Sequence, residues 1–391
     1  MISTDADLRA LLERLRGRAE VSLDCEFHRE GRYHPQLCLV QLSSGEEMAA
    51  LDPFEVDLSP LGEVLADASV VKLFHAAEND LPLLADATGG TIRNVFDTQI
   101  AAAFVGHGAA PAYTVLVERV CGVSLSKRQR FTDWSARPLS KEQVAYALDD
   151  VRYLPRVAAE LRAELERRGR LQWASMAFEE MAAKALAPRD PSRLYLRLGP
   201  LRGMSPRQLA VLREVAVWRD ARAAEVDRPL QRVAPDEALR QIAFNPPRNA
   251  GDVGRLRGLQ GIGGGAAGLL AAVRRALEMP AEDCPPVSES HERDERTELV
   301  SQMLATALRS RANELELAPT LIANRDQLEQ LAVWHFAGRQ GAPPEAAVPG
   351  GWKRDAAGEM LLALLEGRYS LRVKADAPGG VEIMPVTPDA R

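Results

Sequence analysis

Two carboxylates stand two residues apart near the N-terminus. Asp24 and Glu26 alternate with the apolar residues Leu23, Cys25 and Phe27. In a β-strand, alternate residues point to opposite faces, so the two acids share one face and the apolar residues share the other. Adjacent carboxylates raise each other's pKa unless a cation neutralises them. The pattern predicts either a divalent-metal site or two acids on the solvent face of an edge strand.

Further acids that could complete such a site follow in order. Asp80 comes shortly after an apolar strand that ends at Phe74. Tyr146 and Asp150 are four residues apart, so they share one face of a helix, and that face lies off its apolar stripe. Four carboxylates can hold two Mg²⁺ or Mn²⁺ ions about 4 Å apart. One ion would activate a water for attack on phosphorus, the other would stabilise the leaving 3′-oxygen, and the tyrosine hydroxyl would orient the water.

Composition limits the other classes of function. The 391 residues are 46% hydrophobic and 27% charged, which indicates a globular protein of two or three domains. The net charge of -6 disfavours a purely electrostatic nucleic-acid binder but allows an enzyme whose acids hold metals. The sequence shows neither an apolar run of about 20 residues nor a basic, apolar leader, so we expect a cytoplasmic protein without a membrane partner.

The cysteines show no spacing typical of metal ligands. We therefore expect free thiols, without a disulfide framework and without zinc. The four cysteines are Cys25, Cys38, Cys121 and Cys284. The glycine-rich segment 258–265 lacks the Lys-Ser/Thr of a phosphate-binding loop and follows no predicted strand.

The first half alternates predicted strands and helices. A helix over 4–17, capped by Ser3 or Thr4, precedes strands at 21–27, 37–42 and 47–51, which predict an antiparallel meander. Ser59 is predicted to cap a helix, and further strands at 70–74 and 95–96 alternate with helices at 78–86 and 97–104. Ser140 opens a capping box for one long helix to about residue 168. This order predicts a mixed sheet flanked by helices.

The second half is predicted to be helical. Residues 186–204, rich in proline and arginine, are expected to form a linker. Two helical sets of similar length follow at 205–282 and 293–368, and they indicate a diverged repeat. The tail at 369–391 is rich in proline and glycine and is expected to be loose or edge-like.

The motifs, taken in order, resemble the Tyr subtype of the DEDD exonucleases. The order is Asp-x-Glu, then HAAEND (75–80), then Tyr-x-x-x-Asp. Further stretches are similar to the ribonuclease D family: YHPQL (33–37), FDTQI (96–100), TDW (132–134) and RPL (137–139). The resemblance implies an α/β ribonuclease H-like exonuclease domain over 1–185. It also implies two all-α HRDC domains, helical modules shared with RecQ-type helicases.

The resemblance also implies roles for the residues. Asp24, Glu26, Asp80 and Asp150 would be the metal ligands, and Tyr146 would position the water. The family places Tyr before Asp, so Asp149 is interpreted as a neighbour of the site. Two positions depart from the family: Cys25 stands where threonine is frequent, and Asn79 stands where a second acid is frequent. Neither departure removes a ligand, although metal preference could change.

The implied activity is 3′→5′ exoribonuclease action by a two-metal mechanism that releases 5′-mononucleotides. The implied partners are RNA molecules with single-stranded 3′ ends, namely tRNA precursors and other small structured RNAs, and the enzyme is expected to be a monomer. One alternative is a DNA-directed 3′→5′ exonuclease of the same fold. A second alternative is a non-catalytic RNA-binding scaffold, although all four acids are present.

Several possible substrate contacts stay open at this point. His75 could be a structural residue at a strand end or could lie beside the substrate. Gln41 could be an amide at the edge of the core or could face the 3′-terminal nucleotide. Lys127, Arg128 and Arg130 could grip phosphates or could solvate a loop.

Overall fold

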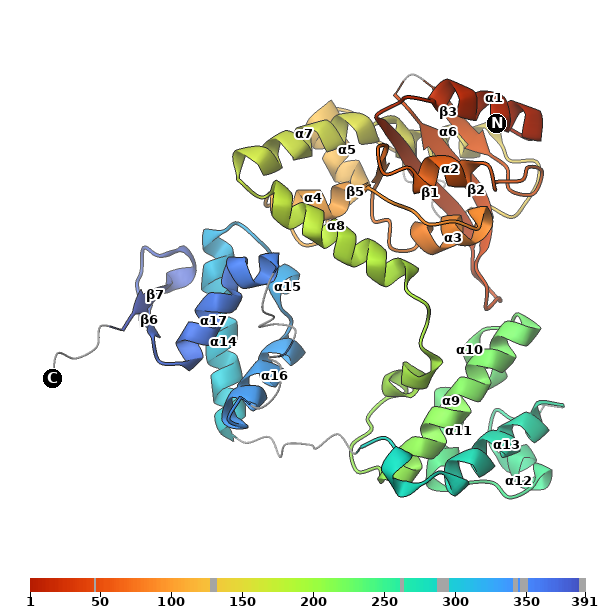
Figure 1. Cartoon of the computed structure of the whole chain (residues 1–391), viewed down its shortest axis with the longest axis vertical. Helices are drawn as coiled ribbons and strands as arrows, with labels where there is room; N and C mark the ends of the chain where they lie inside the picture. Colours follow the sequence, from red (N-terminus) through yellow and green to blue (C-terminus); the bar gives the residue numbers. More distant parts are fainter. Residues whose placement is uncertain are drawn as a thin grey trace. The chain divides into compact units, whose positions relative to one another are not determined.

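The computed structural model describes residues 1–45, 47–126, 132–260, 264–286, 295–339, 344 and 351–386. The chain forms two compact units (Figure 1). The sheet unit comprises residues 1–27, 37–187 and 293–391, and the helical unit comprises residues 28–36 and 188–292. Among the described helices, none combines the length and apolar character needed to cross a bilayer.

The sheet unit contains a mixed five-stranded sheet in the order β3-β2-β1-β4-β5. Strand β1 pairs in parallel with β4, which pairs in parallel with β5, whereas β2 and β3 are antiparallel. The predicted mixed sheet is therefore confirmed. The strands are β1 (Glu20–His28), β2 (Gln36–Ser43), β3 (Met48–Leu51), β4 (Val71–Phe74) and β5 (Val95–Asp97).

Strand β1 lies at the centre of the sheet, so the alternative of an exposed edge strand is wrong. Ser22, on the face that carries the acids, is fully buried. The helices that cover the opposite face are α1 (Asp5–Leu15), α2 (Leu61–Ala66) and α3 (Asp80–Thr88), and they share one apolar cluster with Val21 and Leu23. Ala147 of α6 (Lys141–Arg152) packs with Leu39 of β2 in another cluster. Both faces of β1 are therefore occupied by protein.

Three of the four predicted helix caps are confirmed. The side chains of Thr4 and Asp97 cap α1 and α4 (Thr98–Phe104), and Ser140 forms the predicted capping box with Gln143. The cap predicted at Ser59 is wrong. Pro60 takes the capping position of α2, and the Ser59 hydroxyl instead donates a hydrogen bond to Asp57 at 2.6 Å.

The single long helix predicted from Ser140 is two helices, α6 and α7 (Leu154–Arg167), which meet at Tyr153. Pro155 lies in the first turn of α7, where its missing N–H needs no partner. The proline therefore begins a new helix. Two further helices of the sheet unit were not predicted, namely α5 (Tyr113–Cys121) and α8 (Leu171–Leu186).

The helical unit has an apolar core of its own. Helix α9 (Pro206–Val226) packs against α11 (Asp236–Phe244) and α13 (Gly265–Glu278), and Leu212, Leu239 and Leu269 are buried between them. The shorter elements are η1 (Pro191–Arg197), α10 (Leu230–Val233), α12 (Ala250–Arg255) and η2 (Ala281–Asp283). Part of the predicted linker belongs to this core, because Leu198 and Met204 are buried in it.

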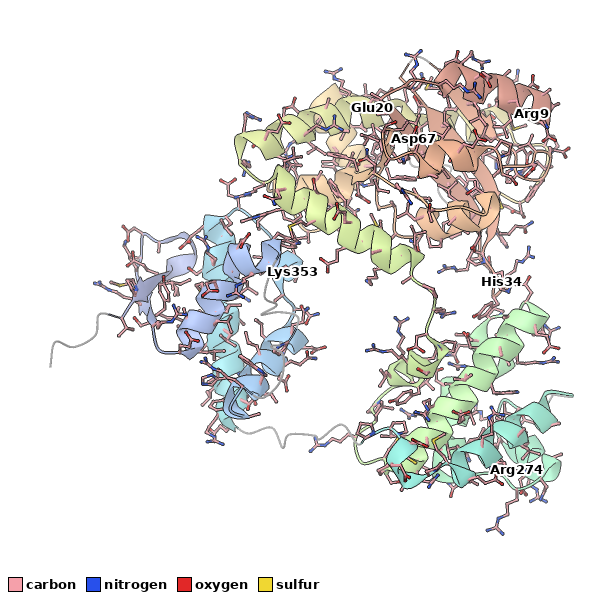
Figure 2. The ribbon with its side chains drawn as sticks, in the orientation of Figure 1. Arg9, Glu20, His34, Asp67, Arg274 and Lys353 are labelled. Atoms are coloured by element: carbon pink, nitrogen blue, oxygen red, sulfur yellow. The ribbon has the colours of Figure 1, made fainter. Side chains whose placement is uncertain are left out.

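The helical unit also includes the excursion between β1 and β2, residues 28–36, whose His34 is labelled in Figure 2. The Tyr33 hydroxyl donates to Asp220 at 2.8 Å. The backbone N–H groups of Tyr33 and His34 donate to Asp227 at 3.1 and 3.0 Å. Asp227 has a left-handed backbone at the end of α9. The chain that leaves β1 is therefore held by side chains of α9.

The described residues within 295–386 form a further helical module, which we call the C-terminal module. Its helices are α14 (Glu295–Glu314), α15 (Pro319–Ile322), α16 (Arg325–Phe336), η4 (Arg354–Gly358) and α17 (Glu359–Leu365). The tail was expected to be loose or edge-like, and over 369–385 it forms paired strands rather than a loose segment. There β6 (Tyr369–Val373) and β7 (Val381–Pro385) form an antiparallel hairpin, joined by η5 (Pro378–Gly380). The Ser310 hydroxyl of α14 donates to the carbonyl of Val381 at 2.6 Å.

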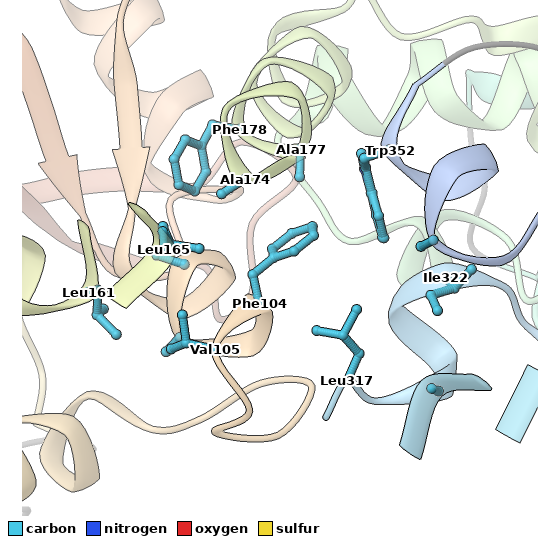
Figure 3. Packing of buried hydrophobic residues seen from close by; sticks show 14 of the residues in the cluster. Phe104, Val105, Leu161, Leu165, Ala174, Ala177, Phe178, Leu317, Ile322 and Trp352 are labelled. Carbon is cyan, nitrogen blue, oxygen red and sulfur yellow. The ribbon is translucent and has the colours of Figure 1, made fainter. Parts of the chain in front are cut away.

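The C-terminal module shares its core with the helices of the sheet unit (Figure 3). The rings of Trp352 and Phe104 lie edge to face, 4.7 Å apart. Leu317 and Ile322 belong to the same buried cluster. At the rim, Lys353 pairs with Glu180 of α8 at 2.9 Å (Figure 2). The predicted domains over 1–185 and 293–368 are therefore continuous through one core.

Candidate active site

Three of the predicted acids converge on one point of the sheet. Carboxylate oxygens of Asp24, Glu26 and Asp150 lie within 4.8 Å of one another. The first two project from the same face of β1, and the third comes from α6. Because the side chains of a strand alternate, a spacing of two residues brings the first pair together.

Asp80 lies next to this group, at the first residue of α3, and is 6% exposed. Burial raises its pKa well above the ordinary value, and the charges of Asp24 and Glu26 raise that pKa further. Asp80 is not one of the three acids whose oxygens meet within 4.8 Å. Asp80 therefore borders the cluster from α3, whereas Asp150 reaches it from α6.

The electrostatics of the cluster favour a bound cation. Burial raises the pKa of Asp24 to about 7. Burial, followed by the charge of Asp24, raises the pKa of Glu26 to about 9 and that of Asp150 to about 8. A divalent ion would relieve this repulsion and displace the protons. The donors are all carboxylate oxygens, which suit Mg²⁺ or Mn²⁺ rather than a thiolate-binding metal.

Helix α6, which presents Tyr146 and Asp150, is anchored at its start. The capping box at Ser140 fixes its first turn. Just before it, Arg137 makes a two-point ion pair with Asp52, at 2.6 and 2.8 Å. The Tyr146 ring lies 6.2 Å from the ring of Trp134, which is 4% exposed. The turn before the helix and the ring contact together fix the orientation of the helix face that bears the site residues.

A cavity of about 670 Å³ opens beside the cluster. This volume lies within the range of small-ligand sites, about 300–1,000 Å³. Tyr146, Asp149 and Asp150 line one side. The remaining lining residues are His75, Gln99, Ala110, Ala112, Tyr113, Thr114, Leu125, Ser126, Glu142 and Ala145. The cavity therefore leaves Asp150 and Tyr146 accessible to a small ligand.

Asp149 and His75 both line the cavity but differ in their contacts. The Asp149 carboxylate pairs with Arg152 at 2.8 Å, which accords with its interpretation as a neighbour of the site. The Nδ1 atom of His75 lies 3.0 Å from the Thr98 hydroxyl, and burial lowers its pKa. His75 therefore has a structural partner and also borders the cavity.

Gln41, another predicted contact residue, is not among the residues that line the cavity. Gln41 is fully buried in β2, and its two amide atoms have no hydrogen-bond partner among the described residues. Its burial accords with the alternative of an amide in the core. Lys127, Arg128 and Arg130 lie outside the described residues.

Sequence reasoning missed two residues that line the cavity. Tyr113 begins α5, a helix that was not predicted, and its ring lies 5.4 Å from the His75 ring. Gln99 follows the Asp97 cap and donates to the carbonyl of Pro111 at 3.2 Å. In the sequence, the stretch FDTQI is marked only by its resemblance to the family. No periodicity or spacing signal identifies either residue, because only the tertiary fold brings them to the cavity.

Comparison with known proteins adds independent findings. The family model described as "3'-5' exonuclease" matches residues 1–166. The HRDC domain model matches residues 208–262, inside the first of the two predicted helical domains. The first match contains Asp24, Glu26, Asp80, Tyr146 and Asp150.

Curated relatives are similar along nearly the whole chain. Ribonuclease D of Gluconacetobacter diazotrophicus is 37% identical over 380 residues, which cover 95% of this chain and 94% of the relative. Ribonuclease D of Granulibacter bethesdensis is 38% identical over 383 residues, with the same shares. The crystal structure of Escherichia coli RNase D matches with a TM-score of 0.82 at 32% identity and covers 94% of this chain and 98% of that one. That protein is described as an exoribonuclease involved in structured RNA processing.

Proposed function

This chain belongs to the ribonuclease D family, and from that premise we propose that it removes nucleotides one at a time from the 3′ end of RNA, using the acid cluster as a divalent-metal site. It is a 3′→5′ exoribonuclease that hydrolyses the terminal phosphodiester and releases a 5′-mononucleotide. The observation that supports the metal site best is the convergence of three buried carboxylates within 4.8 Å.

In this proposal Asp24, Glu26, Asp80 and Asp150 hold two Mg²⁺ or Mn²⁺ ions. When bound, the ions supply a water of lowered pKa and stabilise negative charge on the leaving 3′-oxygen. The Tyr146 hydroxyl, on the same helix face as Asp150, orients the attacking water. Asp24 lies in the middle of β1 and its charge raises the pKa of Glu26, Asp80 and Asp150, which favours Asp24 as the ligand shared by both ions.

We also propose that residues 293–368 are a second HRDC domain. The support is a repeat whose counterparts lie 89 residues apart. Asp227 and Glu316 both have a left-handed backbone after a long helix. Ala234 and Ala323 both end a four-residue helix with an extended backbone, and Asp236 and Arg325 begin the next helices. A constant offset through three pairs of landmarks favours duplication over chance similarity.

The proposed substrates are tRNA precursors with extra 3′ residues and other small structured RNAs whose single-stranded 3′ ends can enter the cavity. The supporting fact is the description of the Escherichia coli relative. The proposal includes a cytoplasmic enzyme that acts as a monomer, which sedimentation of the purified chain can check.

The test is digestion of a 3′-extended tRNA in Mg²⁺ or Mn²⁺. We expect Asp24→Asn and Asp150→Asn to abolish nucleotide release while they retain RNA binding. The matched control is Asp149→Asn, which removes an adjacent carboxylate that pairs with Arg152. Release that persists in Asp24→Asn, or that disappears equally in Asp149→Asn, would refute the assignment of ligands.

Two outcomes of the same assay identify the alternatives. Equal rates on matched single-stranded DNA and RNA would favour the DNA-directed exonuclease, because such an enzyme would not depend on the 2′-hydroxyl. RNA binding without nucleotide release by the wild-type chain in either metal would favour the non-catalytic scaffold.

A further inference from the structure

A carboxylate outside the acid cluster holds the loop that leads to Asp80. Asp97, at the end of β5, is 1% exposed. One of its oxygens accepts the backbone N–H groups of Gln99 at 2.8 Å and Ile100 at 3.1 Å, which caps α4. The other oxygen accepts the backbone N–H of Ala77 at 2.8 Å. The same side chain therefore fixes two segments of backbone, and only one of them is its own helix.

Ala77 passes this restraint to Asp80. The carbonyl of Ala77 accepts the backbone N–H of Asp80 at 2.9 Å and that of Leu81 at 3.0 Å. Asn79, at the capping position of α3, makes no capping hydrogen bond with its side chain. The first turn of α3, which presents Asp80, is thus held through Ala77, and Ala77 is held by Asp97.

The loop needs this restraint because part of it has an unfavourable backbone conformation. Ala76 has a φ of 62°, in the left-handed region that favours glycine. Thr98, next to Asp97, holds the other end of the loop, since its hydroxyl donates to the carbonyl of Phe74 at 2.9 Å. Without these contacts, Ala76 would relax toward negative φ, and the start of α3 would move with it.

We propose that Asp97 is a positioning residue for the metal ligand Asp80, in addition to its role as a helix cap. The inference rests on the proposed function, because it takes Asp80 as a ligand. Asp97 acts through Ala77, and it need not touch a metal ion. Groups that orient metal ligands typically change metal affinity or activity by about 10–100-fold when they are removed.

Asp97→Asn separates the two roles. Asparagine caps helices as well as aspartate does, so its oxygen can still accept from Gln99 and Ile100. Its amide NH₂ would then face the N–H of Ala77, donor against donor, and the restraint on the loop would be lost. The matched control is Thr4→Ala, which removes the cap of α1, a helix that carries no site residue.

The experiment is a Mn²⁺ titration of the full chain without RNA. The electron paramagnetic resonance signal of free Mn²⁺ reports how much of the ion stays unbound. We expect Mn²⁺ to bind Asp97→Asn at least about tenfold more weakly than wild type, and Thr4→Ala to bind as wild type does. The double variant Asp97→Asn with Ala76→Gly should recover part of the affinity, because glycine adopts positive φ without side-chain strain.

Two results would overturn the inference. Wild-type affinity in Asp97→Asn would leave Asp97 as a helix cap only, and failure of Ala76→Gly to recover any affinity would remove the strained loop from the explanation. Should Asp97→Asn fail to fold, Asp97→Ser keeps one oxygen that can cap α4 and removes the second oxygen that holds Ala77. Wild-type Mn²⁺ affinity in that variant would equally contradict the inference. If wild type itself binds no Mn²⁺, the proposed function fails first.

Discussion

The helical unit and the C-terminal module, which we propose to be two copies of one helical domain, bury their apolar faces differently. In the helical unit, α9, α11 and α13 enclose a core made of their own side chains. In the C-terminal module, α14, α16 and α17 contribute to a cluster that also contains Phe104, Ala177 and Phe178. The first repeat is therefore self-contained, and the second completes the core beside the sheet.

An acidic residue with a left-handed backbone follows the long helix in each module, Asp227 after α9 and Glu316 after α14. Asp227 accepts two backbone N–H groups from the excursion after β1. Its counterpart Glu316 pairs with Arg168, which follows α7, at 2.5 Å. One position in the repeat thus contacts chain that flanks the catalytic elements in both cases. The helical unit and the C-terminal module therefore agree in the position of this contact, but they differ in how they bury their apolar side chains.

The largest expected effect is on thermal stability, and it distinguishes the core of the sheet unit from the core of the helical unit. Trp352→Ala removes a 3% exposed indole packed on Phe104, and Trp218→Ala removes a 9% exposed indole inside the helical unit. Substitution of a buried tryptophan by alanine costs about 3–5 kcal/mol. We expect Trp352→Ala to lower the calorimetric transition of the sheet unit and Trp218→Ala to lower only that of the helical unit.

A nucleotide-release assay checks this pair of variants. It is run at temperatures near the calorimetric transition that each variant lowers. Trp352→Ala should lose activity on a short oligonucleotide at a lower temperature than Trp218→Ala does. If activity on the short oligonucleotide survives the transition that Trp352→Ala lowers, the C-terminal module is an independent domain and the shared core is not required.

The second expected effect is a dependence of stability on pH and on metal, and it should appear in the sheet unit alone. The pKa values of Asp24, Glu26 and Asp150 are raised to about 7, 9 and 8, so the folded state holds these protons more tightly than the unfolded state does. Their contribution to metal-free stability is fully present below about pH 4 and is lost as the pH rises through about 7 to 9.

Metal should therefore restore more stability at high pH, where it competes with fewer protons. At 100 times its Kd, a bound ion stabilises the folded state by about 2.7 kcal/mol. We expect Mn²⁺ to raise the sheet-unit transition more at pH 9 than at pH 6 and to leave the helical-unit transition unchanged, as measured by calorimetry. An equal rise at both pH values would contradict the assigned cause of the pKa shifts.

The smallest expected effect concerns the excursion held by α9. Tyr33→Phe removes the hydroxyl that donates to Asp220 at 2.8 Å and accepts from Arg189 at 3.0 Å. Loss of such a hydrogen bond costs about 0.5–1.5 kcal/mol. We expect a small decrease in the stability of the helical unit, measured by urea unfolding. Tyr369→Phe in β6 is the matched control, because the Tyr369 hydroxyl has no hydrogen-bond partner among the described residues, and it should change nothing.

Local signals in the sequence predicted much of the sheet unit. The alternation around Asp24 identified β1, and the caps at Thr4, Asp97 and Ser140 identified three helix starts, because each depends on neighbouring residues only. The break at Tyr153 was missed, although Pro155 marks it. The central place of β1 could not be predicted, since strand order depends on pairing between distant segments.

Motif order sufficed to predict that acids would converge, but it did not predict the residues that only the fold brings to the cavity. Asp24, Glu26 and Asp150 meet as expected. Tyr113 reaches the cavity from an unpredicted helix, and Asp97 was recognised only as a cap. The shared core of Trp352 and Phe104 was equally hidden, because an apolar side chain gives no information about its partner.

The central claim is that the buried acids of β1, α3 and α6 form a two-metal site. Crystals soaked in Mn²⁺ and measured at the manganese absorption edge test it directly. The account predicts two anomalous peaks about 3.5–4 Å apart, in contact with Asp24, Glu26, Asp80 and Asp150, and their loss in Asp24→Asn. Manganese peaks located only away from these four carboxylates would contradict it.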